Sequence, residues 1–176
     1  MFARSIVLSC VVVTACADAS DGPDASPLAD AAVDAAVDAG GADAAGGPCP
    51  LVVNEVAPAG APADWFELVN VGTGPVDLAG YGFIDEADDP AAIFVLPPTV
   101  LAPGGRHVQE VTDAANGFQL GSGDALWLYP VGSTTKCDGV DWNAGDAPAG
   151  SSWARVPDAT GPFMTTTPDT RGVPNR

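Results

Sequence analysis

Hydrophobic and polar positions divide the chain into three parts. An apolar run covers 6–13, the stretch 17–48 is rich in Ala and Asp, and from Cys49 onward short β-branched and aromatic runs alternate with Gly, Pro, Asn and Asp. Such runs, bounded by turn residues, are typical of β-strands. We predict strands at 51–57, 65–71, 80–84, 93–96, 106–111, 125–129, 137–142 and 152–155.

The spacing of these runs predicts that 49–176 is an all-β domain. The strands start about 10 to 20 residues apart, which favours a sandwich or a barrel. No ten-residue stretch of this part keeps a helical period without Gly or Pro, so an α/β fold is not expected. The part is long enough to bury an ordinary two-sheet core.

The first segment predicts export. Its apolar run is too short to cross about 30 Å of hydrocarbon as a helix, so 1–15 is interpreted as a signal peptide. The run ends in Val13-Thr14-Ala15-Cys16, which resembles the lipobox of bacterial lipoproteins. This resemblance implies cleavage before Cys16 and a lipid anchor on its thiol. The alternative is an ordinary signal, with Ala15 and Ala17 in the A-x-A pattern.

The composition of 16–48 predicts a disordered tether that follows the lipidated cysteine in the sequence. It contains seven aspartates, no basic residue and no aromatic residue. Such a composition cannot bury enough apolar area to offset its conformational entropy. A flexible chain of this length spans about 30 Å. We therefore expect a lipid-anchored protein of the bacterial cell envelope, with the outer membrane as the expected membrane and the domain facing the periplasm or the outside.

The net charge of the chain limits the classes of partner that it is expected to bind. The chain has 23 acidic and 6 basic residues, a formal charge of −17. Nucleic acid is not an expected partner, because it is bound through Lys and Arg. Within 49–176, five basic against sixteen acidic residues give −11. This charge favours a basic or cation-bridged partner, expected to be a protein or glycan of the envelope.

An ordered set of motifs in 49–176 carries a family resemblance. The motifs are Asn54-Glu55, Trp65-Phe66-Glu67-Leu68-Val69-Asn70, Leu78-Ala79-Gly80-Tyr81, Leu101-Ala102-Pro103-Gly104, Gly123-Asp124-Ala125-Leu126, Val140-Asp141-Trp142, Arg155 and Gly172-Val173-Pro174-Asn175. Their order resembles the lamin tail domain. The resemblance implies an immunoglobulin-like β-sandwich that serves as an interaction or tethering module, without a shared catalytic set. The loops at 85–89 and 165–169 look less typical of the family.

Two features of the motifs invite a structural interpretation. Alternation in 65–70 places Phe66 and Leu68 on one face and Glu67 on the other, and either face can be the core. An inward glutamate needs a partner, so Arg155 is a candidate for pairing with Glu67 or Glu55. Solvated carboxylates are the alternative. The four tryptophans are interpreted as core and corner residues, with an aromatic platform for sugar as the alternative.

Catalysis has little support in this sequence. The single histidine, His107, lies in a predicted strand, without a nucleophile motif or a metal-binding spacing nearby. The string Gly121-Ser122-Gly123 lacks the strand-to-helix context of a nucleophile elbow. We therefore expect a protein that is not an enzyme. The alternative function is a secreted glycan-binding protein or small hydrolase, which only the carboxylates and tryptophans support.

Two acidic sets are candidates for cation binding. Asp85, Glu86, Asp88 and Asp89 place four carboxylates in five residues, and clustered oxygen ligands suit Ca²⁺. The second set is Asp138, Asp141, Asn143 and Asp146. The alternative for both is a solvated loop on an acidic protein. The first set is also the expected contact for a partner, and no cofactor other than Ca²⁺ is expected.

The cysteines predict one disulfide. Cys10 leaves with the signal and Cys16 takes the lipid, so Cys49 and Cys137 remain in an exported domain where oxidation is permitted. We predict a bond between them. The alternatives are two free thiols, or one buried and one reactive.

Overall fold

Short strands with alternating apolar side chains build two facing antiparallel sheets. The computed structural model describes residues 49–176. One sheet has the strand order β11-β10-β1-β2-β7, the other has β5-β4-β8-β9, and β3 pairs with β6. The elements are β1 (Leu51–Ala57), β2 (Asp64–Asn70), β3 (Val76–Asp77), η1 (Leu78–Gly80), β4 (Tyr81–Ile84), β5 (Phe94–Val95), β6 (Val100–Leu101), β7 (Arg106–Val111), α1 (Asp113–Asn116), β8 (Asp124–Pro130), β9 (Asp138–Trp142), β10 (Ser152–Arg155) and β11 (Phe163–Thr166).

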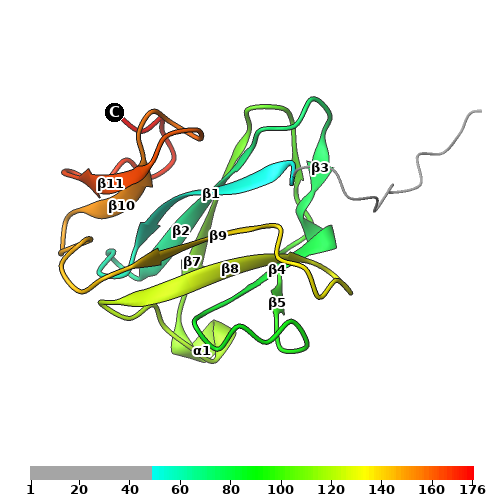
Figure 1. Cartoon of the computed structure of the whole chain (residues 1–176), viewed down its shortest axis with the longest axis horizontal. Helices are drawn as coiled ribbons and strands as arrows, with labels where there is room; N and C mark the ends of the chain where they lie inside the picture. The colour runs from blue at the N-terminus through cyan, green and yellow to red at the C-terminus, as the bar shows by residue number, and fades with distance from the viewer. Residues whose placement is uncertain (1–48) are drawn as a thin grey trace, which may run out of the picture. The chain divides into compact units, whose positions relative to one another are not determined.

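The core lies between the two larger sheets. Figure 1 shows β8 and β9 crossing in front of β1, β2 and β7. Phe66 of β2 meets Phe83 of β4 edge to face, with 4.8 Å between the ring centroids. Fully buried aliphatic side chains from both sheets surround this pair, among them Leu68 and Leu126. The predicted all-β sandwich is confirmed, and Phe66 and Leu68 mark the inner face of β2.

All eight predicted strands form, and all of their ends agree to within one residue. The strand predicted at 93–96 shortens to Phe94–Val95. Three strands were not predicted. β3 and β6 have two residues each, which is too short for an alternating pattern. β11 (Phe163–Thr166) starts directly after Pro162 and carries three polar or exposed side chains, so its sequence resembles a loop.

The outer face of the five-stranded sheet is covered by the last residues of the chain. We call 167–176 the C-terminal segment. Its backbone and side chains bind Glu55 on β1 and Glu67 on β2, and Figure 1 shows it in red beside β10 and β11. This cover explains why both faces of β2 are buried, although only one of them faces the other sheet.

Within 49–176, the structure contains no helix with the length and apolarity needed to cross a membrane. The predictions for 1–15 and 16–48, including lipidation of Cys16, lie outside the described residues.

Candidate functional site

Asp88 fastens the predicted acidic loop to the four-stranded sheet. The loop 85–89 follows β4, and Asp88 adopts a left-handed backbone conformation with φ 52°. Its carboxylate accepts a hydrogen bond from the Tyr129 hydroxyl and lies 2.6 Å from Lys136 Nζ. The pKa of Asp88 is lowered by Lys136 and Tyr129, and burial together with Asp88 raises the pKa of Tyr129 to about 12. The carboxylate of the exposed residue Asp88 is therefore already bound by two residues of the same domain.

The other members of this set shape the loop or face solvent. Asp85 Oδ1 accepts a hydrogen bond from Ala87 N at 3.0 Å, and Asp89 Oδ1 accepts one from Ala91 N at 2.9 Å. Such local bonds are typical of turns. Glu86 is exposed, and a hydrogen bond with Asp124 raises its pKa.

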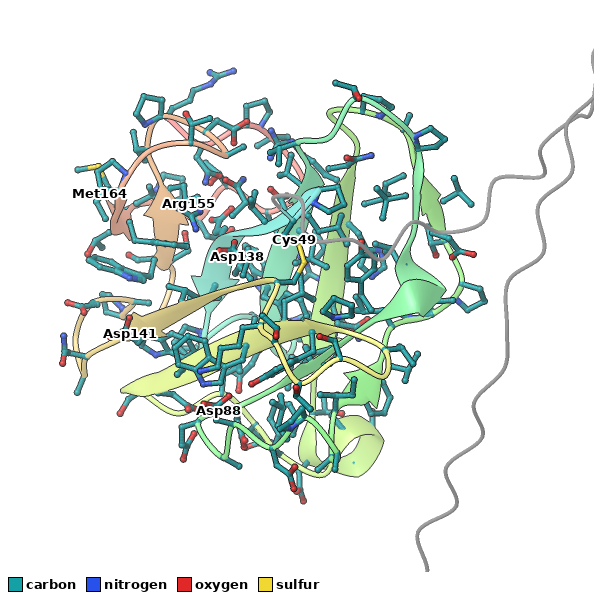
Figure 2. All side chains as sticks on the ribbon, turned by 45° about the vertical axis from the view of Figure 1, so that its right-hand side comes forward. Cys49, Asp88, Asp138, Asp141, Arg155 and Met164 are labelled. Atoms are coloured by element: carbon teal, nitrogen blue, oxygen red, sulfur yellow. A yellow bond between two sulfur atoms is a disulfide. The ribbon has the colours of Figure 1, made fainter. Side chains whose placement is uncertain are left out.

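The second acidic set is dispersed. Asp138 turns toward β1, Asp141 is exposed, and Asp146 Oδ2 accepts a hydrogen bond from Asn143 N at 2.8 Å. Figure 2 shows Asp138 near the disulfide, whereas Asp88 of the first set lies at the bottom of the view. Among residues 49–176 no three His, Cys, Asp or Glu side chains are grouped to hold a metal ion. Calcium binding stays a prediction.

A disulfide and an ion pair connect the two sheets on one side of the sandwich. Cys49 and Cys137 form a disulfide, with 5.1 Å between their Cα atoms, as predicted. Next to it, Asp138 Oδ2 accepts a hydrogen bond from Val53 N at 2.7 Å, and Arg155 Nε donates to Val53 O at 2.9 Å. The pairing of β1 with β10 covers only Glu55 and Val56. On the β10 side of β1, these side chains therefore bind the backbone of Val53 in place of a strand, while Val53 pairs with Leu68 of β2 on its other side.

Arg155 pairs with neither Glu67 nor Glu55, and the alternative of solvated carboxylates is wrong too, because both glutamates are fully buried. Arg155 forms an ion pair with Asp138, with 3.3 Å between Nη2 and Oδ2. Ala154 lies opposite Glu55 in the sheet, so alternation turns Arg155 to the other face, away from the glutamates. The cation of Glu67 is Arg106 of β7, whose Nη1 lies 2.6 Å from Glu67 Oε1.

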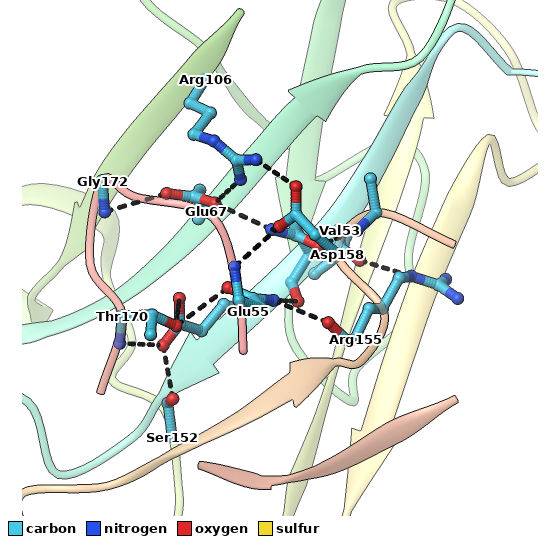
Figure 3. Close-up of polar contacts among 12 residues, drawn as sticks. Val53, Glu55, Glu67, Arg106, Ser152, Arg155, Asp158, Thr170 and Gly172 are labelled. Atoms are coloured by element: carbon cyan, nitrogen blue, oxygen red, sulfur yellow. Dashed lines mark hydrogen bonds and ion pairs between the residues drawn. The ribbon is translucent and has the colours of Figure 1, made fainter. Parts of the chain in front are cut away.

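Buried polar groups form one cluster under the C-terminal segment, shown in Figure 3. We define the polar cluster as Asn54, Glu55, Glu67, Arg106, Ser152, Asp158, Thr170 and Asn175. Asn54, Glu55 and Glu67 are fully buried. Buried polar groups are costly unless they are hydrogen-bonded, and in this cluster each side chain has a partner.

One half of the polar cluster centres on Glu67. In addition to its ion pair with Arg106, Glu67 accepts hydrogen bonds from Asn54 Nδ2 and from Gly172 N, each at 2.9 Å. Gly172 has φ +78°, a conformation that favours glycine. Arg106 also binds Asp158, so one guanidinium serves two carboxylates. Burial opposes ionisation of Asp158, but bonds from Arg106, Asn175 N and Asn54 outweigh it and lower its pKa.

The other half centres on Glu55, which has neutral partners only. Thr170 N donates to Glu55 Oε1 at 2.8 Å, and the Ser152 hydroxyl donates to the same oxygen. Thr170 Oγ1 lies 3.0 Å from Glu55 Oε2. Asn175 Nδ2 donates to the carbonyls of Asn54 and Arg155. The motif residues Asn54, Glu55, Glu67 and Asn175 thus hold the C-terminal segment on the sheet.

The residues considered for chemistry or sugar binding lie apart. His107 is half-buried on β7, with Nε2 3.5 Å from Gln109 Oε1. Trp65 and Trp142 are buried. Lys136 Nζ covers the Trp127 ring at 3.5 Å. Trp153 stacks on Phe163, so each of the two half-buried rings, Trp127 and Trp153, packs on another side chain of the domain.

Sequence reasoning missed Arg106, Asp158 and Thr170 as members of the polar cluster. Arg106 lies 52 residues from Asp158 in the sequence, and Thr170 lies 115 residues from Glu55. No local pattern signals such pairs. The comparisons with protein-family models, curated proteins and solved structures gave no match.

Proposed function

We propose that this chain is a bacterial cell-envelope lipoprotein, anchored through Cys16, which presents 49–176 as a non-catalytic, lamin tail-like interaction or tethering domain. One observation carries the proposal. Polar residues of the family-like motifs, Asn54, Glu55, Glu67 and Asn175, are buried and bound within the polar cluster. Side chains engaged in this way stabilise a surface for binding and are not free to act on a substrate.

The arrangement along the chain supports a tethering role. The lipobox-like string ending at Cys16 precedes an acidic stretch of about 30 residues, which spans about 30 Å as a flexible coil. Two lipid chains on such a cysteine give stable membrane anchoring. A rigid domain on this tether searches for partners close to the membrane surface.

Charge indicates the partner's chemistry. The net charge of −11 over 49–176 favours a basic or cation-bridged partner. Of the four acidic residues proposed as contacts, Asp88 is occupied by Lys136 and Tyr129. The contact set is therefore Asp85, Glu86 and Asp89, at the loop that follows β4 (Tyr81–Ile84).

Partner capture from bacterial envelope extracts tests the proposal. Residues 49–176 contain their own core, so this domain can be immobilised alone. We expect the triple variant Asp85→Asn, Glu86→Gln, Asp89→Asn to capture less partner and to lose salt sensitivity. A matched triple variant with other exposed acids, Glu110→Gln, Asp113→Asn and Asp141→Asn, controls for total charge.

Equal capture by the two triple variants would remove the loop as the contact. Measured turnover of a substrate by the purified domain would overturn the non-catalytic function. Loss of capture when Ca²⁺ is chelated would instead indicate a cation-bridged contact.

A further inference from the structure

Two buried glutamates face each other across neighbouring strands. Glu55 of β1 and Glu67 of β2 are direct cross-strand partners, and both are fully buried under the C-terminal segment. Like charges directly opposite each other destabilise a sheet, and carboxylates that share a site do not ionise equally. The two environments differ, because Arg106 binds Glu67, whereas Glu55 has neutral donors only.

The hydrogens around Glu55 can be counted. Oε1 receives the Thr170 N–H and the Ser152 hydroxyl. Oε2 faces Thr170 Oγ1 at 3.0 Å, and the same Oγ1 lies 2.9 Å from Asn175 Oδ1. A hydroxyl has one hydrogen to donate. Thr170 therefore cannot satisfy Glu55 Oε2 and Asn175 Oδ1 at once.

The orientation of Asn175 decides where that hydrogen goes. Its Nδ2 donates to Asn54 O at 3.1 Å and to Arg155 O at 3.0 Å. Reversing the amide would place its oxygen against two carbonyl oxygens, so the hydrogen-bond network fixes the assignment. Asn175 Oδ1 is therefore an acceptor that competes with Glu55 Oε2 for the hydrogen of Thr170. Both oxygens have a hydrogen bond only if Thr170 donates to Asn175 Oδ1 and Glu55 Oε2 carries a hydrogen of its own, which it donates to Thr170 Oγ1.

We propose that Glu55 is a neutral carboxylic acid in the folded domain at neutral pH, and that loss of its proton to solvent base releases the C-terminal segment from the five-stranded sheet. Ionisation removes the hydrogen of Glu55, so the single hydroxyl hydrogen of Thr170 can serve only Glu55 Oε2 or Asn175 Oδ1. The segment then loses one hydrogen bond and covers a buried charge that has no cation, which is costly.

The neighbouring charges do not compensate an ionised Glu55. Glu67 faces it from β2 and adds repulsion. The charged groups on the other elements around Glu55 are Arg106 of β7, Asp158 after β10, Arg155 of β10, and Asp169 and Arg171 of the C-terminal segment. The three arginines already have acidic partners. Arg106 pairs with Glu67 and Asp158, Arg155 pairs with Asp138, and Arg171 pairs with Glu110.

The direction of titration agrees with this geometry. Burial raises the pKa of Glu55, the hydrogen bonds from Ser152 and Thr170 act against the rise, and the charge of Glu67 adds to it. A folded-state pKa above the unfolded value means that the folded state binds more protons. The stabilising contribution is complete below the unfolded pKa of Glu55 and is lost as pH rises through the folded pKa. The C-terminal segment should therefore open on the alkaline side.

Carbon-13 NMR of the glutamate side-chain carboxyls, in the purified full chain uniformly labelled with carbon-13 and nitrogen-15, tests the protonation directly. The sequence has four glutamates, Glu55, Glu67, Glu86 and Glu110, so four signals are expected. At neutral pH the Glu55 signal should have the chemical shift of a neutral acid. Correlation with the backbone amide of Glu55 assigns the signal without a variant. A carboxylate shift for Glu55 at neutral pH would overturn the proposal.

Amide exchange of Thr170 and Gly172 tests the release. Protection, corrected for the intrinsic pH dependence of exchange, should fall by up to about tenfold per pH unit between the unfolded and the folded pKa of Glu55 and should level off above the folded pKa. Glu55→Gln keeps a donor toward Thr170 Oγ1 and cannot ionise, so it should retain protection at alkaline pH. Asp141→Asn, which removes an exposed acid on β9, should behave as the wild type. Constant wild-type protection through the titration of Glu55 would refute the release, even if Glu55→Gln does not fold.

Discussion

Arg106 and Glu67 form an ion pair on the outer face of the five-stranded sheet, with 2.6 Å between Nη1 and Oε1. The Glu67 side chain is fully buried, and the side chain of Arg106 is 16% exposed. The second guanidinium nitrogen of Arg106 binds Asp158. A single side chain on β7 thus connects the edge of the sheet to β2 and to the loop after β10.

Replacing Arg106 should destabilise the domain strongly. Arg106→Ala leaves Glu67 as a buried carboxylate without a cation, and breaking such a pair typically costs about 3 to 5 kcal/mol. Arg106→Lys should recover part of the loss, because an ammonium cannot match the two-pronged contact of a guanidinium. Urea unfolding measures both. Arg171→Ala is the control, since Arg171 pairs with the half-exposed Glu110 and should cost less than about 1 kcal/mol. Equal losses for the two alanine variants would contradict the importance of the buried pair.

Removing the disulfide should also destabilise the domain. Cys49 and Cys137 are 88 residues apart, and closing a loop of this length contributes about 4 to 5 kcal/mol in the chain-entropy model. We expect reduction, or the double change Cys49→Ala and Cys137→Ala, to lower the urea midpoint. Mass spectrometry of the unreduced domain should find neither thiol available for alkylation. Two alkylatable thiols would disprove the bond in solution.

Acid should weaken the domain through Asp158. Its pKa is below the ordinary value of 3.8 in the folded state, so the unfolded state binds more protons in this range. The contribution is present above pH 3.8 and is lost as pH falls through the lowered pKa. Stability measured against pH should decline on this acid side, and Asp158→Asn should be less stable near neutrality and show a shallower decline. An unchanged acid slope in Asp158→Asn would exclude Asp158 as the cause.

Lipidation of Cys16 stays a prediction from the lipobox-like string. Expressed in a bacterial host, the chain should incorporate labelled fatty acid and partition into detergent, and Cys16→Ser should abolish both. Cys10→Ser is the matched control, because Cys10 ends a second string of this kind, Val7-Leu8-Ser9-Cys10, after a shorter apolar run. A mature amino terminus at Asp18 without lipid would favour the ordinary signal peptide.

Local patterns predicted most of the sandwich. Strands such as β1 (Leu51–Ala57) and β7 (Arg106–Val111) have the predicted bounds, because alternation and turn residues are properties of neighbouring positions. The disulfide was predictable too, since 49–176 contains only two cysteines. β11 was missed, because it forms only by pairing with β10.

The candidate site was predicted less well. The acidic loop 85–89 was recognised from composition, but Asp88 proved to be bound by Lys136 and Tyr129, which are 48 and 41 residues further along the chain. Arg155 was considered as a partner for the wrong carboxylates. Alternation along a strand shows which residues share a face, but it does not show which face the C-terminal segment covers.

The sequence by itself determined the division of the chain, the all-β class and the acidic character, because composition and local alternation carry this information. Only the tertiary structure decided the partners of Glu55 and Glu67. The C-terminal segment brings Thr170 and Gly172 onto the outer face of β1 and β2, across more than a hundred residues. A contact over such a separation depends on how the sheets twist and on which polar groups are left to satisfy after the core has formed.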